Sequence, residues 1–474
     1  MNDDRRLIFG LFLVVLAVRL MALAGTYTFG TDSAAFLRMA ELMREGSWHE
    51  ALKTGYHPGY PAAIAAVASV TGNIVGAGFL VSLLFGSLAV LPLFLLARDS
   101  FGRPAALITV ALYALHYSLV DLHTDVMTEG LFCATLFTAL WMGARFIDAR
   151  KLAWALGAGL AAAGAYLVRH EGLIAVCGLV CWFAFEAVRR RNRESGDFVL
   201  GIGFLAGAFF IASMPFLNWV RQEMGQWATT AKGSGIPLRM ALEGEAVSYR
   251  GDLTAKALIA FVRLNYFVLL VPLAAGLALA WRQKRWRRLY LLSWALAYYA
   301  GVAYTMQGMG YVSYRYLLPG FCILLPFIAW GLLELIRLWP MGPPHRVAAI
   351  ATFALCLLVG YRNFDVHRWE DLPLVRAGEW IRGHSQGRPR ILSTRDKVAW
   401  FAKGDLGPPP ATTDEAAAAD FLVFTRHDFD RREWACMPDL ERDARFERIP
   451  DDFTAGAKRQ RPVILYRVKP QKKS

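Results

Sequence analysis

The stretch Ile74–Leu96 reads IVGAGFLVSLLFGSLAVLPLFLL and contains no charged residue. A helix needs about 20 mostly apolar residues to cross a bilayer, so this stretch can form one complete span. The whole chain shares the bias, because 56% of its 474 residues are hydrophobic and only 19% are charged. Soluble domains contain about 45–50% apolar and about 25% charged residues. The composition therefore predicts an integral membrane protein.

Ten further apolar blocks lie along the chain, and together they predict an all-α polytopic domain with about eleven transmembrane helices. Several blocks are short for a span of roughly 17–25 residues, so tilted or re-entrant helices remain alternatives for them. The predicted spans are Leu7–Leu23, Ile74–Leu96, Pro104–Leu119, Val126–Phe146, Leu152–Val168, Gly172–Val188, Phe198–Val220, Tyr266–Trp281, Leu289–Tyr304, Tyr316–Ile336 and Val347–Val359.

Basic residues gather in alternate loops, such as Arg189–Arg193 and Arg282–Arg288, whereas Tyr117–Thr124 contains none. Because basic loops stay in the cytoplasm, the N-terminus is predicted to be cytoplasmic and the protein to be a multi-pass protein of the bacterial inner (plasma) membrane. The segments Thr26–Asn73 and Arg221–Arg263 then face outwards. The same clustering accounts for the net charge of +14, because basic residues of this kind set the orientation of a membrane protein. This argues against nucleic acid as a partner.

The character of the chain changes after residue 360. The tail Tyr361–Ser474 is polar, and its helix-like and strand-like runs predict a small α/β domain. We therefore expect a transmembrane domain at residues 1–360 and a periplasmic α/β domain at residues 361–474. The predicted runs are the helix Leu372–Gly383 and the strands Arg390–Thr394, Phe421–Thr425 and Val463–Tyr466.

The first outer segment combines two helical patterns with a turn rich in proline and glycine. Asp32 precedes an amphipathic pattern in which Phe36 and Met43 share one face, so this helix is predicted to lie in the membrane interface. The helix dipole favours an acidic side chain at this position, and helix capping is an alternative role for Asp32. The turn Tyr56–Pro61 reads YHPGYP, and it presents His57 at the membrane surface.

The second outer turn carries two carboxylates. Asp125 and Glu129 are four residues apart, so we predict that they share one face of a helix. Carboxylates so close to hydrocarbon are costly unless they face a cavity or a charged partner. A functional role and a structural pair with Arg or His are therefore both open for them.

Two later outer turns carry basic and acidic side chains. The third turn contains Arg169, His170 and Glu171, and the fifth contains Arg315 next to Tyr314. All these turns are predicted to lie at the same membrane surface. Such a convergence of carboxylates, histidines and arginines suits an anionic lipid headgroup together with acid–base chemistry.

Arg19 interrupts the first apolar block. A charge within a span is expensive, so we expect its guanidinium either to reach the membrane surface or to contact an anionic headgroup. A cleavable signal peptide is an alternative for this block, since Ala22–Ala24 is similar to a cleavage site.

These segments resemble the C-type glycosyltransferases, which include the protein O-mannosyltransferases, the lipid A aminoarabinose transferases and bacterial family-39-like proteins. The resemblance covers roughly residues 7–336, and it rests on the order, spacing and membrane side of the motifs. The segments that carry it are Thr31–Trp48, Tyr56–Pro61, Asp125–Phe132, Ala165–Leu173 and Tyr314–Leu332.

The resemblance implies a C-type (GT-C) fold and a sugar transfer from a polyprenyl-phosphate donor to an acceptor hydroxyl of a lipid, glycan or protein, with inversion at the anomeric carbon. It also implies that Asp32 is the general base. Where many members have a second acid after this Asp, the present chain has Ser33. Where the aminoarabinose branch has an acidic-basic pair, it has Tyr56-His57, which weakens an assignment to that branch and its metal site.

Roles for the remaining residues follow from this expectation. His57 and Asp125 are candidate catalytic residues, and Arg315, with Arg169 or Arg19, is expected to neutralise the leaving phosphate. No cofactor is required, but Asp32 and Asp125 are alternative ligands of a divalent cation. The remaining substrate-binding candidates are Glu129, His170, Glu171, Tyr56 and Tyr314.

Two rival functions are weighed against this one. A lipid-linked sugar flippase or transporter would predict internal repeats and broken helices at the midplane, and no repeat is evident in the sequence. A non-catalytic receptor would have no use for the carboxylate in the first outer segment. The sequence therefore favours a glycosyltransferase.

Overall fold

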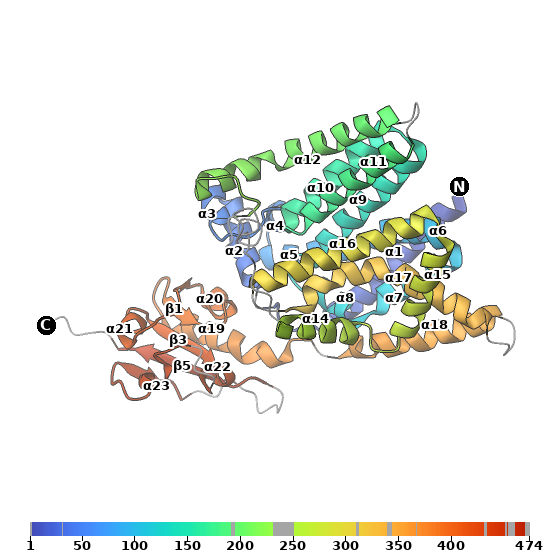
Figure 1. Cartoon of the computed structure of the whole chain (residues 1–474). Coiled ribbons are helices and arrows are strands. Elements are labelled where there is room, and N and C mark those ends of the chain that lie inside the picture. The colour runs from blue at the N-terminus through green and yellow to red at the C-terminus, as the bar shows by residue number, and fades with distance from the viewer. Residues whose placement is uncertain are drawn as a thin grey trace. The chain divides into compact units, whose positions relative to one another are not determined.

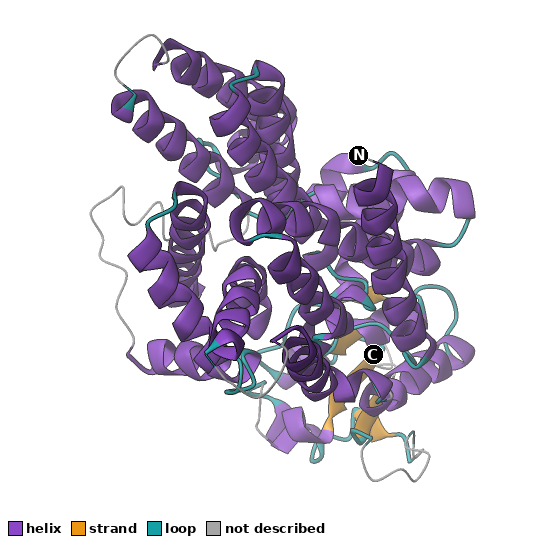
Figure 2. Cartoon of the chain, turned by 90° about the vertical axis from the view of Figure 1, so that its right-hand side faces the viewer, coloured by secondary structure: helices purple, strands orange, loops and turns teal. Residues whose placement is uncertain are grey.

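A computed structural model describes residues 2–30, 32–190, 195–230, 251–309, 312–338, 344–365, 367–430, 434–450, 453 and 460–469. The chain divides into two compact units. The membrane unit comprises Met1–Ala22 and Met39–Phe364, and the C-terminal unit comprises Leu23–Arg38 and Asp365–Ser474. The membrane unit is helical, whereas the strands belong to the C-terminal unit (Figures 1 and 2).

Helices dominate the described part of the chain up to residue 364. Their bounds are α1 Asn2–Ala24, α2 Ser33–Arg44, α3 Trp48–Leu52, α4 Gly59–Thr71, α5 Ile74–Leu88, α6 Val90–Phe101, α7 Arg103–Leu115, α8 Tyr117–His123, α9 Glu129–Ala149, α10 Leu152–Val168, α11 Gly172–Arg189, α12 Ser195–Met224, α14 Gly251–Leu264, α15 Leu270–Gln283, α16 Trp286–Met309, α17 Tyr314–Arg337, α18 Pro344–Gly360 and the short 3-10 turn η2 Tyr361–Phe364.

All eleven predicted spans coincide with helices, but the number of spans is not confirmed. Among the described residues, 7 helices are long and apolar enough to cross a membrane, or up to 8 if the bent pair α7 and α8 is one span. The pair bends by 59°. Two predicted spans form helices of only 17 and 14 residues, α10 and α15. The coarser prediction of a multi-pass helical membrane protein is confirmed.

The core of the membrane unit is built around α17. In the most apolar 18-residue stretch of α17, 83% of the residues are buried, compared with 17% in the corresponding stretch of α1. A helix that is apolar on every side must be covered by others, and α17 packs against α15, α16 and α7. In the other part of the unit α10 lies between α9 and α12 (Figure 1).

The first outer segment forms the two helices predicted for it, α2 and α4, with the short α3 between them. On α2 the side chains of Phe36 and Met43 are buried and Arg44 is exposed, which agrees with the predicted amphipathic pattern. The YHPGYP turn ends where α4 begins, at Gly59. Of the predicted outer segment Arg221–Arg263, residues 231–250 lie outside the described residues, and α14 forms its last part.

The C-terminal unit contains a five-stranded sheet with the strand order β2-β1-β3-β5-β4. β1 is parallel to β2 and β3, whereas β5 is antiparallel to β3 and β4. The strands are β1 Arg390–Ser393, β2 Asp405–Leu406, β3 Phe421–Thr425, β4 Phe446–Arg448 and β5 Val463–Val468. The helices are η3 Trp369–Asp371, α19 Leu372–His384, α20 Lys397–Ala402, α21 Thr413–Ala416, α22 Arg426–Asp430 and α23 Met437–Leu440.

Two apolar cores cover the two faces of this sheet. One contains Ile391, Val423 and the inner faces of α19 and α20, and the other contains Leu392, Phe424 and residues of α21 and α23. Successive strand residues point to opposite faces of the sheet, so the same strands contribute side chains to both cores. The predicted α/β character and three predicted strands agree with the structure. The strands β2 and β4 were not predicted, because two or three residues give no periodic signal.

The domain boundary requires one correction. We expected Leu23–Arg38 to belong to the transmembrane domain at residues 1–360, but the structure groups this segment with Asp365–Ser474. The backbone explains the grouping. The amide of Tyr27 donates a hydrogen bond to the carbonyl of His367 at 3.2 Å, and the amide of His367 donates one to the carbonyl of Gly25 at 3.1 Å.

Candidate functional site

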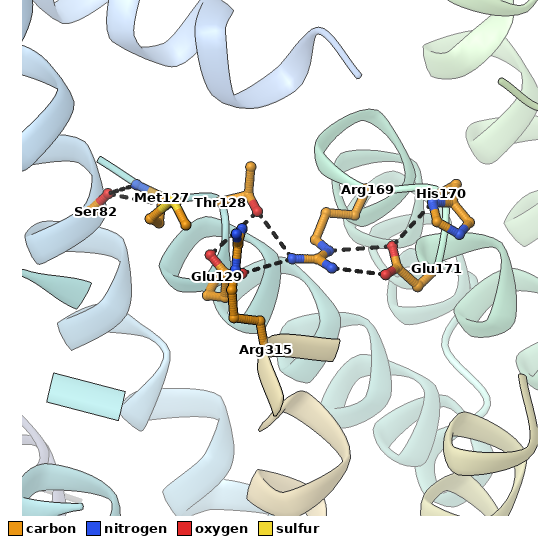
Figure 3. Close-up of polar contacts among 8 residues, drawn as sticks. All are labelled: Ser82, Met127, Thr128, Glu129, Arg169, His170, Glu171 and Arg315. Carbon is orange, nitrogen blue, oxygen red and sulfur yellow. Dashed lines mark hydrogen bonds and ion pairs between the residues drawn. The ribbon is translucent and has the colours of Figure 1, made fainter. Parts of the chain in front are cut away.

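A buried cluster of charged side chains forms where three turns meet that were predicted to face outwards. The start of α9 supplies Glu129, the turn between α10 and α11 supplies Arg169 and Glu171, and the start of α17 supplies Arg315 (Figure 3). Four residues from three predicted turns are thus brought together, and each was a candidate on sequence grounds.

The four side chains form a continuous chain of ion pairs. Arg315 Nε lies 2.8 Å from Glu129 Oε1, and Arg169 Nη1 lies 2.9 Å from the same oxygen. On its other side Arg169 holds Glu171 through two hydrogen bonds, with Nη2 at 2.8 Å from Oε1 and Nε at 3.3 Å from Oε2. Such two-point contacts fix the relative orientation of the two planar groups.

Two glycines allow the turns to come this close. A Cβ on Gly130 would lie 2.6 Å from the carbonyl oxygen of Ser82, so the glycine lets the first turn of α9 press against α5. A Cβ on Gly172 would lie 2.2 Å from the amide nitrogen of Tyr166, so the chain after Glu171 folds back onto the end of α10. Both positions are therefore restricted to glycine by space.

Because this cluster is buried, each charge in it must be offset by a neighbouring charge. Glu129 is fully buried, and the side chains of Arg169 and Glu171 are 9% and 2% exposed. Burial opposes ionisation of Glu171, but Arg169 and His170 outweigh it and lower the pKa of Glu171. Burial likewise opposes the charge on Arg169, while Glu171 and Glu129 raise its pKa well above the usual value. These two groups are therefore charged at neutral pH.

The loop before Glu129 is anchored by hydrogen bonds to hydroxyl groups. The amide of Met127 donates to Ser82 Oγ at 3.1 Å, and this hydroxyl also contacts the carbonyl of Met127 and the hydroxyl of Tyr60. Arg169 Nη1 donates to Thr128 Oγ1 at 3.2 Å. Sequence reasoning missed Ser82, Tyr60 and Thr128, because no charge marks them.

His57 lies beside the cluster in the same unit. Its ring is 6.2 Å from the ring of His170, and it packs against Tyr166 and Phe216. His170 Nδ1 lies 3.4 Å from Glu171 Oε2, which links the histidines to the ion pairs. Burial, with a smaller contribution from His170, lowers the pKa of His57 to about 3. His57 is therefore neutral at physiological pH, with one donor and one acceptor nitrogen.

Arg19 does not reach a membrane surface. It is fully buried, and its Nε and Nη2 lie 3.1 and 3.0 Å from His123 Nδ1, while Nη1 donates to the carbonyl of Val15. The guanidinium also lies over the ring of Tyr113 at 5.0 Å. The snorkelling expected for Arg19 is therefore wrong, because internal acceptors replace water. Its partner His123 was missed, because the two residues are 104 positions apart.

Asp125 and Glu129 do not share a helix face. α9 begins at Glu129, and Asp125 lies in the turn before it, where the amide of Val126 donates to the Asp125 carboxylate at 2.7 Å. A carboxylate that binds its own turn favours the turn over an extra helical turn. Asp125 is nevertheless 2% exposed. Its proposed catalytic role stays a prediction.

The two tyrosine candidates occupy more open positions. Tyr56 is half-buried in the turn before α4, where its amide donates to Thr54 Oγ1 at 3.5 Å. Tyr314 is the first residue of α17 and is 41% exposed. Their substrate-binding roles stay predictions.

Asp32 belongs to the C-terminal unit and directly precedes α2. Burial and, to a smaller extent, the charge of Asp32 raise the pKa of Asp396. Asp396 was not a candidate on sequence grounds, because the two residues are far apart in the chain. Within the described ranges, no group of three or more His, Cys, Asp or Glu side chains could hold a metal ion. The alternative of a cation at Asp32 and Asp125 stays a prediction.

Known proteins resemble the chain in sequence only over part of its length. Residues 56–219 match the profile of the dolichyl-phosphate-mannose-protein mannosyltransferase family. This range includes His57, Glu129, Arg169 and Glu171. No curated protein sequence matches the chain.

Solved structures resemble it more widely. ArnT from Cupriavidus metallidurans, bound to undecaprenyl phosphate, aligns over 96% of this chain and 97% of its own, with 14% identity and a TM-score of 0.59. The oligosaccharyltransferase AglB from Archaeoglobus fulgidus, in complex with an inhibitory peptide and a dolichol-phosphate, aligns over 91% and 71%, with 13% identity and a TM-score of 0.55. Arabinofuranosyltransferase AftD from mycobacteria aligns over 98% and 40%, with 16% identity and a TM-score of 0.57.

The fold and the matches define a class. The chain is a polytopic membrane protein with the C-type glycosyltransferase fold, as the sequence resemblance predicted. Its likeness to mannosyltransferases is confined to residues 56–219. At 13–16% identity the structural matches speak for the fold.

Proposed function

We propose that this protein transfers a sugar from a polyprenyl-phosphate donor to an acceptor hydroxyl at the outer face of a bacterial inner membrane. The observation that carries the proposal is the buried cluster of Glu129, Arg169, Glu171 and Arg315, built in a fold shared with a transferase that was solved bound to undecaprenyl phosphate. The acceptor is a lipid, glycan or protein, and the reaction inverts the anomeric carbon.

Arg315 is the proposed ligand of the donor phosphate. Its side chain is 21% exposed, compared with 9% for Arg169, so it is the more accessible of the two arginines. The leaving group is a phosphate monoester, which gains negative charge as the sugar departs. A guanidinium stabilises this charge without proton transfer. Glu129, which also binds Arg169, holds Arg315 in place.

Asp32 is the proposed general base. Its carboxylate takes the proton from the acceptor hydroxyl while the oxygen attacks the anomeric carbon and the bond to phosphate breaks. General-base catalysis contributes about 10²–10⁴-fold to such rates. Neutral His57 assists by orienting the acceptor through a hydrogen bond, because both its ring nitrogens lack a partner of good geometry among the described residues.

The decisive experiment measures sugar release from polyprenyl-phosphate mannose, glucose and aminoarabinose in detergent, with and without EDTA. We expect Asp32→Asn to reduce turnover by about 10²–10⁴-fold relative to wild type. Asp252→Asn serves as a matched control, since Asp252 is an exposed acid paired with Lys256 on α14. Wild-type turnover in Asp32→Asn at equal expression would reject the assignment of the base, and loss of activity in EDTA would reveal a required cation.

A further inference from the structure

The segment that carries Asp32 is bound to the C-terminal sheet domain within one compact unit. Besides the backbone pairing of Tyr27 with His367, the ring of Tyr27 contacts Trp369 at 4.9 Å. These contacts fix the start of the segment. A catalytic carboxylate needs such support, because a misplacement of about 1 Å costs roughly 10²-fold in rate.

Phe29 is the strongest anchor of this segment. Its side chain is 2% exposed and stacks on Phe401 of α20, with ring centroids 5.3 Å apart and planes inclined by 12°. Trp400 meets the same ring edge-on at 6.3 Å. Asp32 is three positions after Phe29 in the sequence, a reach of at most about 11 Å. Fixing Phe29 therefore restricts the position of Asp32.

The surface that receives Phe29 is itself rigidly held. Lys397 of α20 is fully buried, its Nζ lies 6.0 Å from the centre of the Phe29 ring, and it forms an ion pair with Asp371 at 2.7 Å. Arg461 contacts the other oxygen of Asp371 at 3.0 Å. Burying a lysine is costly without such a partner, so the pair fixes α20 relative to η3.

Asp396 lies at the start of α20, just after the carboxyl end of β1. The strand order changes direction here, because β2 and β3 lie on opposite sides of β1. In open α/β sheets the carboxyl ends at such a point form the usual binding crevice. The loop is ordered by Asp428, which accepts hydrogen bonds from Thr394 at 2.8 Å and from Arg395 at 2.9 Å.

We propose that the C-terminal unit positions the general base. In this arrangement Phe29 fixes the Asp32 segment on α20. The inference rests on the proposed role of Asp32. It makes Phe29 a positioning residue, and it gives the C-terminal unit a direct part in the reaction.

Two variants of the full-length protein test this inference. Phe29→Ala should lower kcat by about 10²-fold with little change in the KM for the donor, because it misplaces the base without touching the donor. Hydrogen exchange should rise in the amides of Leu23–Arg38. Phe429→Ala is the matched control, since Phe429 is a partly buried aromatic residue of the other core of the same domain. It should change neither kcat nor this exchange.

The outcomes separate this inference from the proposed function. Wild-type turnover in Asp32→Asn would overturn both. An inactive Asp32→Asn, together with an unchanged kcat in Phe29→Ala, would overturn the positioning role alone. If Phe29→Ala lost folded protein but kept kcat per folded molecule, the contact would be structural only, and the inference would again be wrong.

Discussion

At the scale of single residues, the site is a balance of buried charges. Glu129 accepts a hydrogen bond from each arginine through the same oxygen. Its negative charge is therefore shared between Arg315 and Arg169. Charges removed from water need such partners, and the loss of one partner leaves the others uncompensated. Stability and the proposed binding of the donor phosphate therefore depend on the same carboxylate.

Glu129→Gln should destabilise the protein by about 3–5 kcal/mol, the usual cost of breaking a buried ion pair. The amide keeps the shape of the carboxylate but leaves Arg315 and Arg169 without its charge. Thermal unfolding in detergent measures the effect. Glu50→Gln is the control, because the pair between Glu50 and Lys53 is exposed. Equal unfolding midpoints for the two variants would contradict the importance of the cluster for folding.

His57 should make the protein less stable in acid. Its pKa is about 3 in the folded state and 6.5 in the unfolded state, so only the unfolded state binds the proton between these values. Stability should thus fall as the pH drops below 6.5, by up to about 1.4 kcal/mol per pH unit.

His57→Gln should remove this part of the pH dependence, because glutamine does not titrate. Unfolding curves of both proteins from neutral pH to pH about 4 make the comparison. Parallel curves for wild type and variant would show that His57 is not buried in its neutral form.

At the scale of elements, close helix contacts position the site. α15 and α17 approach so closely that a Cβ on Gly331 would lie 1.9 Å from the carbonyl oxygen of Pro272. On the facing helix, a Cβ on Gly276 would lie 2.1 Å from the carbonyl oxygen of Phe327. Small residues at such crossings are typical of membrane helices. Because Arg315 lies at the start of α17, this packing helps to fix the helix that carries Arg315.

Gly331→Ala should destabilise the protein by about 1–3 kcal/mol, because the added methyl group clashes with backbone atoms that cannot rotate away. Gly203→Ala on α12 is the matched control, since its Cβ would meet nothing within 4 Å. We expect the control to be neutral or stabilising, as alanine favours helix more than glycine does. Midpoints of thermal unfolding compare the two, and a neutral Gly331→Ala would argue against this close crossing.

At the scale of the whole molecule, the proposed reaction depends on the orientation of the chain in the membrane. The basic loops predict a cytoplasmic N-terminus and a periplasmic C-terminal unit. Alkaline phosphatase needs the oxidising periplasm for its disulfides. Its fusion after residue 474 should therefore be active, and a fusion after Arg190 should be inactive. The reverse pattern would place the site in the cytoplasm.

Much of the architecture was predictable because its causes are local. Apolar runs gave the helices, and the change of composition after residue 360 indicated the sheet domain. The prediction failed where two local signals favour different structures, or where an apolar stretch is too short to indicate a span. Asp125 was placed on the helix of Glu129, although its own carboxylate stabilises a turn there. The number of spans was not determined either, since α10 and α15 are apolar but short.

The sequence by itself determined which chemical groups the outer turns carry, namely Glu129, Arg169, Glu171 and Arg315. Only the tertiary structure decided their partners. Arg315 and Glu129 are 186 positions apart, and no local pattern distinguishes this pair from a pair with Arg19, which the fold instead gives to His123. Helix periodicity acts over a few residues, whereas partner choice depends on how whole helices pack. The same reason explains why Asp32, next to α2 in sequence, belongs with a domain more than 300 residues further along the chain.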